Sequence, residues 1–462
     1  MANITTDELL AGIRTAVEER ADLYIRLADD IWEFAELGFA ESRSSRAQMD
    51  VLAAEGFKIT TGIGGLPTAF LAERGSGKPV IGLLGEFDAL AGMSQVAGSD
   101  KEEALQPGQP GHGCGHNLLG TGSALAAVAA AEMLLQMGIA GTIRYYACPA
   151  EEGGGGKAFM ARAGTFDDLD AAFSWHPGTK SSAHMNRTSA FTQIRVVFRG
   201  RASHAALTPH LGRSALDAAE LMNIGCNYLR EHMQDGERIH YAYRDAGGTA
   251  ANVVQARIEL AYIVRSQTIE AVRALTARVE RIASGAAIMT DTEFEFSIES
   301  GMSPYQPNRV LTQMMHEQFV AVGAPDFDDS DLATAAAFVG LEHEQNRSLD
   351  SEIAPLSDRI GNSLGSTDVG DVSVITPVAQ IWVASFARNT AFHSWQLVSQ
   401  GKLPAAHKGM LQAAKVMAIA AIRAIQDPDL LEQARKEHRL SFAGATYDCP
   451  IPADVLPPLP KR

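Results

Sequence analysis

The order of strand-like and helical segments is the feature that most restricts how this chain can fold. Before residue 190, short apolar runs suited to buried strands alternate with helical segments. The strand-like runs cover residues 68–72, 80–85, 142–147 and 171–175, and a long buried helix is expected over 117–137. Strands that alternate with helices predict an α/β fold, a sheet flanked by helices. The same pattern resumes at residue 308 and ends in a helix over 409–425.

A segment with a different rhythm separates these two parts. Its expected strands are residues 191–198, 237–243, 253–264 and 293–298, and its expected helices are 213–233 and 269–287. The order βαββαβ is typical of a ferredoxin-like α+β unit. A chain of 462 residues is long enough for two domains. We therefore predict one α/β domain built from residues 1–189 and 302–462, with a ferredoxin-like domain inserted at 190–301.

The charge and the cysteine content exclude several classes of protein. Lys and Arg total 39 against 55 Asp and Glu, which gives a net charge of −16. A surface this negative repels phosphate backbones and anionic lipids, so we expect neither nucleic acid nor membrane as a partner. The 4 cysteines are too few for a disulfide framework, and no basic stretch followed by an apolar run opens the chain. These features predict a cytoplasmic protein.

Four short motifs carry metal-binding residue types at the ends of expected strands or in loops, where open α/β sheets place their sites. They are Gly111-His112-Gly113-Cys114-Gly115-His116-Asn117, Pro149-Ala150-Glu151-Glu152, Ser174-Trp175-His176-Pro177 and Phe392-His393-Ser394-Trp395. Each motif alone has an ordinary interpretation: a glycine-rich turn, an acidic surface turn or a structural histidine. Together their thiol, imidazole and carboxylate groups form a complete ligand set for two divalent metals.

The acidic pair in the second motif has a further property. Adjacent carboxylates that close a strand project in different directions, so one can bind a metal while the other faces a metal-bound water as general base. The four glycines that follow, residues 153–156, allow the backbone to approach a ligand closely. The pair therefore indicates hydrolytic chemistry.

These motifs resemble those of the metal-dependent aminoacylase and carboxypeptidase superfamily, and within it the amidohydrolase branch that includes the aminobenzoyl-glutamate utilization proteins. The resemblance runs along almost the whole chain. Its motifs are Trp32-Glu33-Phe34-Ala35-Glu36-Leu37-Gly38-Phe39, the glycine-rich loop at 111–117, Cys148-Pro149-Ala150-Glu151-Glu152, Ser366-Thr367-Asp368-Val369-Gly370-Asp371-Val372-Ser373 and His393-Ser394-Trp395. It implies a zinc-peptidase-like α/β catalytic domain whose inserted domain serves as lid and dimerisation unit.

The resemblance also implies residue roles. The implied metal ligands are Cys114, His116, Glu152, His176 and His393. Glu151 would be the general base, and Cys114 stands where the carboxypeptidase branch has a bridging carboxylate. Asp88, His112 and Asp368 would orient the ligands, although a helix-capping role is equally open for Asp368.

The inserted domain would add residues that face the substrate. By resemblance, His204 enters the active site of the other subunit, where its imidazole can donate to the tetrahedral oxyanion. Asn252 and Arg265 match positions that bind the substrate carboxylate or the transition-state oxygen, and an Arg suits a carboxylate because its planar fork gives two parallel bonds. Four neighbouring arginines compete for this role: Arg195, Arg199, Arg201 and Arg257.

The function implied is hydrolysis of the amide bond of an N-acyl or N-aroyl amino acid such as p-aminobenzoyl-glutamate. Alternatives are a dipeptidase for unusual β-alanyl dipeptides and a hydrolase for auxin conjugates such as indole-3-acetyl-aspartate. A scaffold that has lost catalysis is disfavoured because Glu151 and every ligand are retained. The expected cofactors are two Mn²⁺ or Zn²⁺ ions, and the expected assembly is a homodimer, with or without a homologous second subunit.

Overall fold

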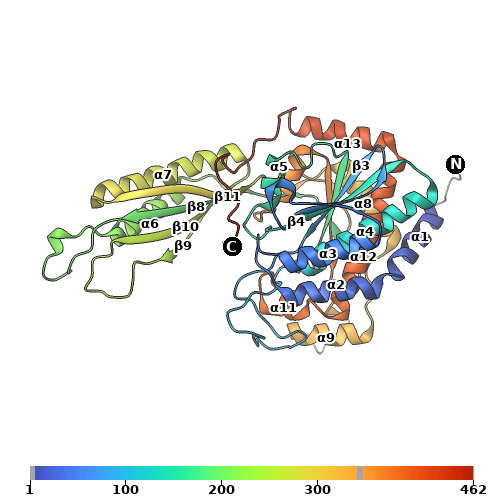
Figure 1. Cartoon of the computed structure of the whole chain (residues 1–462), viewed down its shortest axis with the longest axis horizontal. Coiled ribbons are helices and arrows are strands. Elements are labelled where there is room, and N and C mark those ends of the chain that lie inside the picture. The colour runs from blue at the N-terminus through green and yellow to red at the C-terminus, as the bar shows by residue number, and fades with distance from the viewer. Residues whose placement is uncertain (1–5, 341–346, 461–462) are drawn as a thin grey trace.

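The computed structural model describes residues 6–340 and 347–460. An elongated arm projects from a broad α/β part, which contains the N-terminal end, and the C-terminal end lies where the two parts meet (Figure 1). The arm consists of strands β8 to β11 with helices α6 and α7. The predicted α/β fold with an inserted α+β unit is therefore confirmed.

A seven-stranded sheet forms the centre of the α/β part, in the order β1-β2-β4-β3-β5-β13-β6. Its strands are β1 (Lys58–Thr61), β2 (Phe70–Ser76), β3 (Val80–Glu86), β4 (Gly141–Cys148), β5 (Ala171–Gly178), β13 (Val378–Ala384) and β6 (Ser182–Ala183). The four central strands β4, β3, β5 and β13 run parallel, and β1, β2 and β6 are antiparallel to their neighbours. All seven residues of β3 are buried, as expected for a strand covered on both faces.

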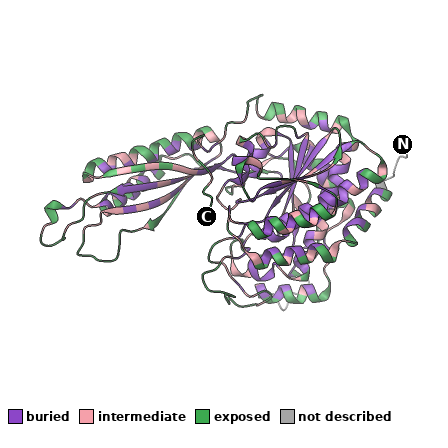
Figure 2. Ribbon diagram, viewed as in Figure 1, coloured by how far each residue is buried: buried purple, intermediate pink, exposed green. Residues whose placement is uncertain are grey.

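Helices cover both faces of this sheet (Figures 1 and 2). They are α1 (Thr6–Glu18), α2 (Ala21–Phe34), α3 (Ser42–Ala54), α4 (His116–Met137), α5 (Gly156–Arg162), α8 (Arg309–Val322), α9 (Asp329–Val339), α10 (Val369–Ile375), α11 (Trp395–Gln400), α12 (Pro404–Gln426) and α13 (Pro428–Ser441). A 3-10 turn over Ile63–Gly65 and the two-stranded pair β7 (Asn186–Arg187) and β12 (Gly361–Asn362) also belong to this part.

Helix α4 is the central core helix, as the sequence predicts. It is long and apolar enough to cross a membrane, but 89% of its most apolar window is buried inside the protein, as in the core helix of a soluble fold. It lies against β3 because small residues line the contact: a Cβ at Gly120 would lie 2.5 Å from the carbonyl oxygen of Glu86. This close approach brings the start of α4 next to the end of β3.

The arm has its own sheet and its own hydrophobic core. Its elements are β8 (Ala190–Arg199), α6 (Ala215–Leu229), β9 (Arg238–Asp245), β10 (Arg257–Ser266), α7 (Ile269–Thr290) and β11 (Glu293–Met302). The order β11-β8-β10-β9, antiparallel throughout, is that of a ferredoxin-like unit. Buried and half-buried residues alternate along β10 because the helices cover one face of the sheet.

Two predicted boundaries in the arm are wrong. The expected strand over 253–264 begins only at Arg257, because Val253 forms an isolated bridge with His204 and the Val254 amide donates to Ser203 O at 3.0 Å. The expected helix over 213–233 ends at Leu229 and continues as one 3-10 turn. In both cases a tertiary contact or tighter turn replaces the regular pattern suggested by the apolar residues.

Candidate active site

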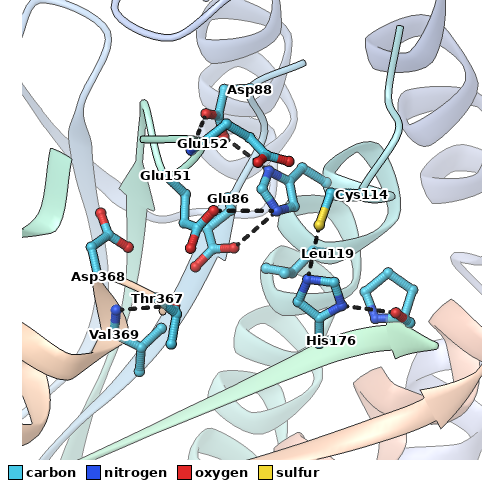
Figure 3. A network of polar contacts seen from close by, with 12 residues as sticks. Glu86, Asp88, Cys114, Leu119, Glu151, Glu152, His176, Thr367, Asp368 and Val369 are labelled. Carbon is cyan, nitrogen blue, oxygen red and sulfur yellow. Dashed lines mark hydrogen bonds and ion pairs between the residues drawn. The ribbon is translucent and has the colours of Figure 1, made fainter. Parts of the chain in front are cut away.

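The loops that follow β3 and β4, the end of β5 and the start of α4 converge at one edge of the central sheet (Figure 3). The five predicted ligands come together there: Cys114, His116, Glu152, His176 and His393. Glu151 lies beside them, with Oε2 4.0 Å from His116 Nε2. The structure thus brings the candidate ligands of the four motifs together beyond the carboxyl ends of parallel strands.

Two groups of donor atoms overlap at one thiol. Cys114 forms one group with His116 and His176 and a second group with Glu152 and His393, and within each group the ligand atoms lie within 4.8 Å of one another. The Cys114 Sγ is 3.4 Å from His176 Nε2, and His393 Nε2 is 3.5 Å from Glu152 Oε2. These two donor groups would suit a pair of divalent cations.

Two histidine rings are already oriented for metal binding. His116 Nδ1 lies 2.9 Å from Asp88 Oδ1, and His176 Nδ1 lies 2.8 Å from the Pro177 carbonyl oxygen. Because these oxygens only accept, each Nδ1 donates its proton to them, and Nε2 is the ring atom that remains to face a ligand. His116 Nε2 and Glu152 Oε1 are buried and accept or donate no hydrogen bond among the described residues. The residues therefore fit a pair of divalent metal ions.

The loop that carries Glu151 and Glu152 is held through its backbone. Three of its amides donate to three buried carboxylates: Ala150 to Glu41, Glu152 to Asp88 and Lys157 to Asp368, each at 2.8 Å. Ala150 adopts a φ of +58°, a backbone conformation that residues other than glycine rarely adopt. The turn before the acidic pair therefore needs these hydrogen bonds to hold it. His393 adopts a φ of +57°, and its amide donates to Gly113 O at 2.9 Å.

The three residues predicted to orient the ligands are placed differently. Asp88 contacts both His116 and Glu152, as expected. Asp368 precedes α10 but makes no capping bond to it, so the capping interpretation is wrong; its carboxylate accepts from Lys157 instead. His112 is buried with Nε2 3.0 Å from Ile31 O, so it anchors the glycine-rich loop to α2 rather than contacting a ligand.

Sequence reasoning missed three buried ionisable residues at this site. Glu86 ends β3 with Oε2 3.3 Å from His116 Nε2, and Lys157 Nζ donates to Glu86 Oε1 at 2.6 Å. Glu41 holds the Ala150 amide. Glu86 lies at the end of a predicted strand, two residues before Asp88, so its position could have indicated a site residue. The sequence around Glu41 and Lys157 does not distinguish them from charged residues at the surface.

The electrostatics of the acidic pair follow from burial and crowding. Burial, together with the nearby Glu86 and Asp368, raises the pKa of Glu151 well above its usual value. Burial also raises the pKa of Glu152 to about 7. Burial and the neighbouring His116 lower the pKa of His176 to about 4, so this ring is neutral at physiological pH. Divalent cations would offset the crowded negative charge and favour both ionised carboxylates.

His204 and Asn252 lie together in the arm, because the Ala205 amide donates to Asn252 O at 3.0 Å. The His204 Nδ1 accepts from the amides of Ala206 and Leu207, both at 3.2 Å, which leaves Nε2 directed away from the turn. Both residues are exposed, and within the described parts of the chain no hydrogen bond or ion pair joins them to the metal-ligand group. The structure therefore does not bring these two residues to the site of their own subunit.

Arg265 differs from the arginines that compete with it. Its Nη1 donates to Ser366 Oγ at 2.7 Å, which connects the arm to the α/β part, and no acidic side chain pairs with it among the residues that the structure describes. Three of its competitors pair with acidic residues of the arm sheet: Arg195 with Glu259, Arg199 with Glu295, and Arg257 with Asp245 and Glu259. Arg201 donates to the Leu211 carbonyl.

Comparison with known proteins agrees with this geometry. The model of peptidase family M20/M25/M40 matches residues 83–346. The chain is 43% identical to one subunit of the p-aminobenzoyl-glutamate hydrolase of Escherichia coli (strain K12), over 97% of this chain and 99% of that protein. It is 28% identical to the Xaa-Arg dipeptidase of Mus musculus, over 92% of this chain and 90% of that one.

Solved structures share the fold. A dinuclear metal-binding peptidase of the M20 family from Bacillus subtilis superimposes with a TM-score of 0.56 at 19% identity, covering 88% of this chain and 99% of that chain. The predicted resemblance is thus confirmed along nearly the whole chain. The chain belongs to peptidase family M20/M25/M40, and it is a metal-dependent amide hydrolase.

Proposed function

We propose that this enzyme hydrolyses the amide bond of p-aminobenzoyl-glutamate or a closely similar N-aroyl amino acid, using two divalent metal ions. The observation that carries the proposal is the pair of donor groups that share Cys114, with Glu151 beside them. The substrate class is supported by the 43% identity to the Escherichia coli protein that is named for this hydrolysis.

The residues divide the reaction between them. Cys114, His116, Glu152, His176 and His393 would hold the metals. When bound, such ions lower the pKa of a water molecule and polarise the scissile carbonyl. Glu151 accepts the proton of the attacking water and returns it to the departing amine. Burial, with Glu86 and Asp368 nearby, raises its pKa above the usual value, which makes its carboxylate a stronger base for this proton.

The arm would supply the remaining contacts. His204 donates to the oxyanion from the partner subunit, since in its own subunit it contacts no metal-ligand residue among those described. Arg265, which has no acidic partner among the described residues, binds the substrate carboxylate, and Asn252, which lies beside His204, would, like His204, act at the site of the other subunit. These roles require a homodimer, and the naming of the Escherichia coli relative as one subunit of a hydrolase also favours assembly with a homologous second subunit.

Three further properties belong to this proposal. The metals are Mn²⁺ or Zn²⁺; the thiolate favours zinc, whereas carboxylate and imidazole ligands also accept manganese. The α/β part (1–189 and 302–462) and the inserted part (190–301) are separate domains, which the separate hydrophobic core of the arm supports. A cytoplasmic location agrees with four cysteines that form no disulfide.

A substrate panel tests the proposal. Protein reconstituted with Mn²⁺ or Zn²⁺ is assayed on p-aminobenzoyl-glutamate, indole-3-acetyl-aspartate, hippurate, β-alanyl-lysine and an Xaa-Arg dipeptide, with and without a chelator. We expect chelator-sensitive release of p-aminobenzoate with the highest kcat/KM. Preference for the Xaa-Arg dipeptide would support the second candidate, a dipeptidase, to which the 28% identity to the mouse enzyme points. Turnover that a chelator leaves intact would contradict the metal mechanism.

A further inference from the structure

Three buried charged side chains form a connected unit behind the acidic loop. Lys157 Nζ donates to Asp368 Oδ1 at 2.5 Å and to Glu86 Oε1 at 2.6 Å. Lys157 and Asp368 are completely buried, and Glu86 is 2% exposed. The pKa of the Lys157 ammonium stays well above its usual value, because Asp368 and Glu86 outweigh the effect of burial, so the lysine is charged.

The unit joins three segments that are far apart in sequence. Glu86 is the last residue of β3, Lys157 lies in the first turn of α5, and Asp368 immediately precedes α10. The Asp368 Oδ2 also accepts from the Lys157 amide at 2.8 Å. Asp368 therefore accepts hydrogen bonds from both the backbone and the side chain of Lys157, and these bonds fix the end of the loop that carries Glu151.

The free oxygen of Glu86 points the other way, toward the site. Its Oε2 lies 3.3 Å from His116 Nε2, the atom left for a metal, and Glu86 and Glu151 both face this nitrogen (Figure 3). With His116 and Glu151, Glu86 forms a third group whose ligand atoms lie within 4.8 Å of one another. Lys157 thus holds one oxygen of a carboxylate whose other oxygen faces the reacting groups.

We propose that Lys157 is a positioning residue for hydrolysis. It fixes Glu86 through one carboxylate oxygen so that the other oxygen stays facing His116, and it ties the loop that carries Glu151 to Asp368. This inference rests on the proposed two-metal function. The competing explanation is that the buried charges only stabilise the fold, in which case the folded variants bind metal and turn over like the wild type.

The key variant is Glu86→Gln. The amide oxygen still accepts from Lys157, but the side chain can no longer present a charged oxygen to His116. We expect kcat to fall about 10- to 100-fold with KM changed less than about twofold, the range typical of groups that orient metal ligands. Lys157→Met, which removes both side-chain bonds, should give at least the same loss of kcat, and Lys157→Arg should recover part of it.

Binding of Co²⁺ gives a readout that needs no substrate. The visible absorption of Co²⁺ reports its coordination geometry, so titration of the metal-free proteins measures affinity and geometry together. For Glu86→Gln we expect an altered spectrum or an affinity about 10-fold lower for one of the two ions. If the wild type hydrolysed no substrate in the panel while this difference persisted, the proposed substrate would be wrong and the positioning role would stand.

The chain offers a matched control for the lysine. Lys408 Nζ also contacts two aspartates, Asp328 at 2.8 Å and Asp331 at 2.5 Å, but its side chain is partly exposed, and neither aspartate is a candidate metal ligand. Lys408→Met should leave kcat, KM and the Co²⁺ spectrum unchanged.

Charge balance and positioning are separated by a double variant. Lys157→Met with Asp368→Asn restores the net charge of the unit but leaves Glu86 unanchored, so we expect its stability to recover and its kcat to stay low. The inference is overturned if this double variant has wild-type kcat, or if folded Glu86→Gln matches the wild type in kcat and Co²⁺ binding. Should Lys157→Met alone not fold, Glu86→Gln and the double variant decide; failure of Glu86→Gln to fold would assign the unit to structure alone.

Discussion

Replacement of Asp88 by Asn is the sharpest single test of how the metal-ligand group is oriented. In the native structure its Oδ1 accepts from His116 Nδ1 at 2.9 Å and its Oδ2 accepts from the Glu152 amide at 2.8 Å. An asparagine has only one acceptor oxygen. If that oxygen faces Glu152, the NH₂ group meets His116 Nδ1, which must then give up its proton to Nε2 and lose the lone pair for the metal. If the oxygen faces His116, two donors meet at the Glu152 amide and the loop must move.

The expected loss of metal affinity can be estimated for either orientation of the asparagine. Each orientation removes one hydrogen bond to a charged group, which contributes about 1.5–3 kcal/mol. Loss of an orienting partner typically lowers metal affinity about 10- to 100-fold, or about 1.4–2.8 kcal/mol. The two magnitudes are similar, so we expect Asp88→Asn to bind metal about 10- to 100-fold less tightly.

Competition against a chromophoric chelator measures this affinity directly. The matched control is Asp371→Asn, because Asp371 is also fully buried and accepts from Ser303 Oγ at 2.6 Å and Tyr447 OH at 2.8 Å without touching a metal-ligand residue. The control should be less stable but should bind metal like the wild type. Wild-type metal affinity in folded Asp88→Asn would refute the reasoning that Asp88 sets the tautomer of His116.

Three further outcomes are expected. Glu151→Gln should keep both metals by elemental analysis and lose about 10²- to 10⁴-fold in kcat, and near-normal turnover would remove Glu151 as the base. A His204→Ala protein mixed with Glu151→Gln should regain part of its activity after subunit exchange, since each chain supplies what the other lacks; no recovery after demonstrated exchange would contradict a histidine acting across subunits. Burial raises the pKa of Asp371 to about 7, from 3.8, so the folded chain holds a proton that the unfolded chain releases. The contribution of this proton to the free energy of unfolding is complete below about pH 4 and is lost as pH rises through about 7, by at most about 1.4 kcal/mol per pH unit. In denaturant unfolding of the metal-free proteins, the free energy of unfolding should therefore fall less steeply with pH for Asp371→Asn than for the wild type. Equal slopes for the two proteins would rule out this role of Asp371.

The elements with strong local patterns were predictable. The apolar run of β3 and the small, apolar residues of α4 each specify their own structure, because burial on both faces requires apolar residues whatever packs against them. The start of β10 was not predictable from the sequence. Val253 and Val254 are apolar and β-branched, as in a strand, but they pair with the turn at His204. A pairing between loops leaves no periodicity in the sequence.

The residues of the candidate site also fall into a predictable and an unpredictable group. The metal-ligand types stand in short motifs at strand ends, so topology alone brings Cys114, Glu152 and His176 together once the strands are known to be parallel. The residues that hold them in place do not stand in recognisable sequence motifs. Glu41 and Lys157 look like ordinary surface charges in the sequence, and only tertiary packing buries them with their partners. Because an unpaired buried charge is strongly destabilising, such residues persist only where every partner is in place. The acidic loop is therefore specified less by its own sequence than by carboxylates contributed from three distant segments, which is why sequence motifs find the metal-ligand residues and miss the groups that orient them.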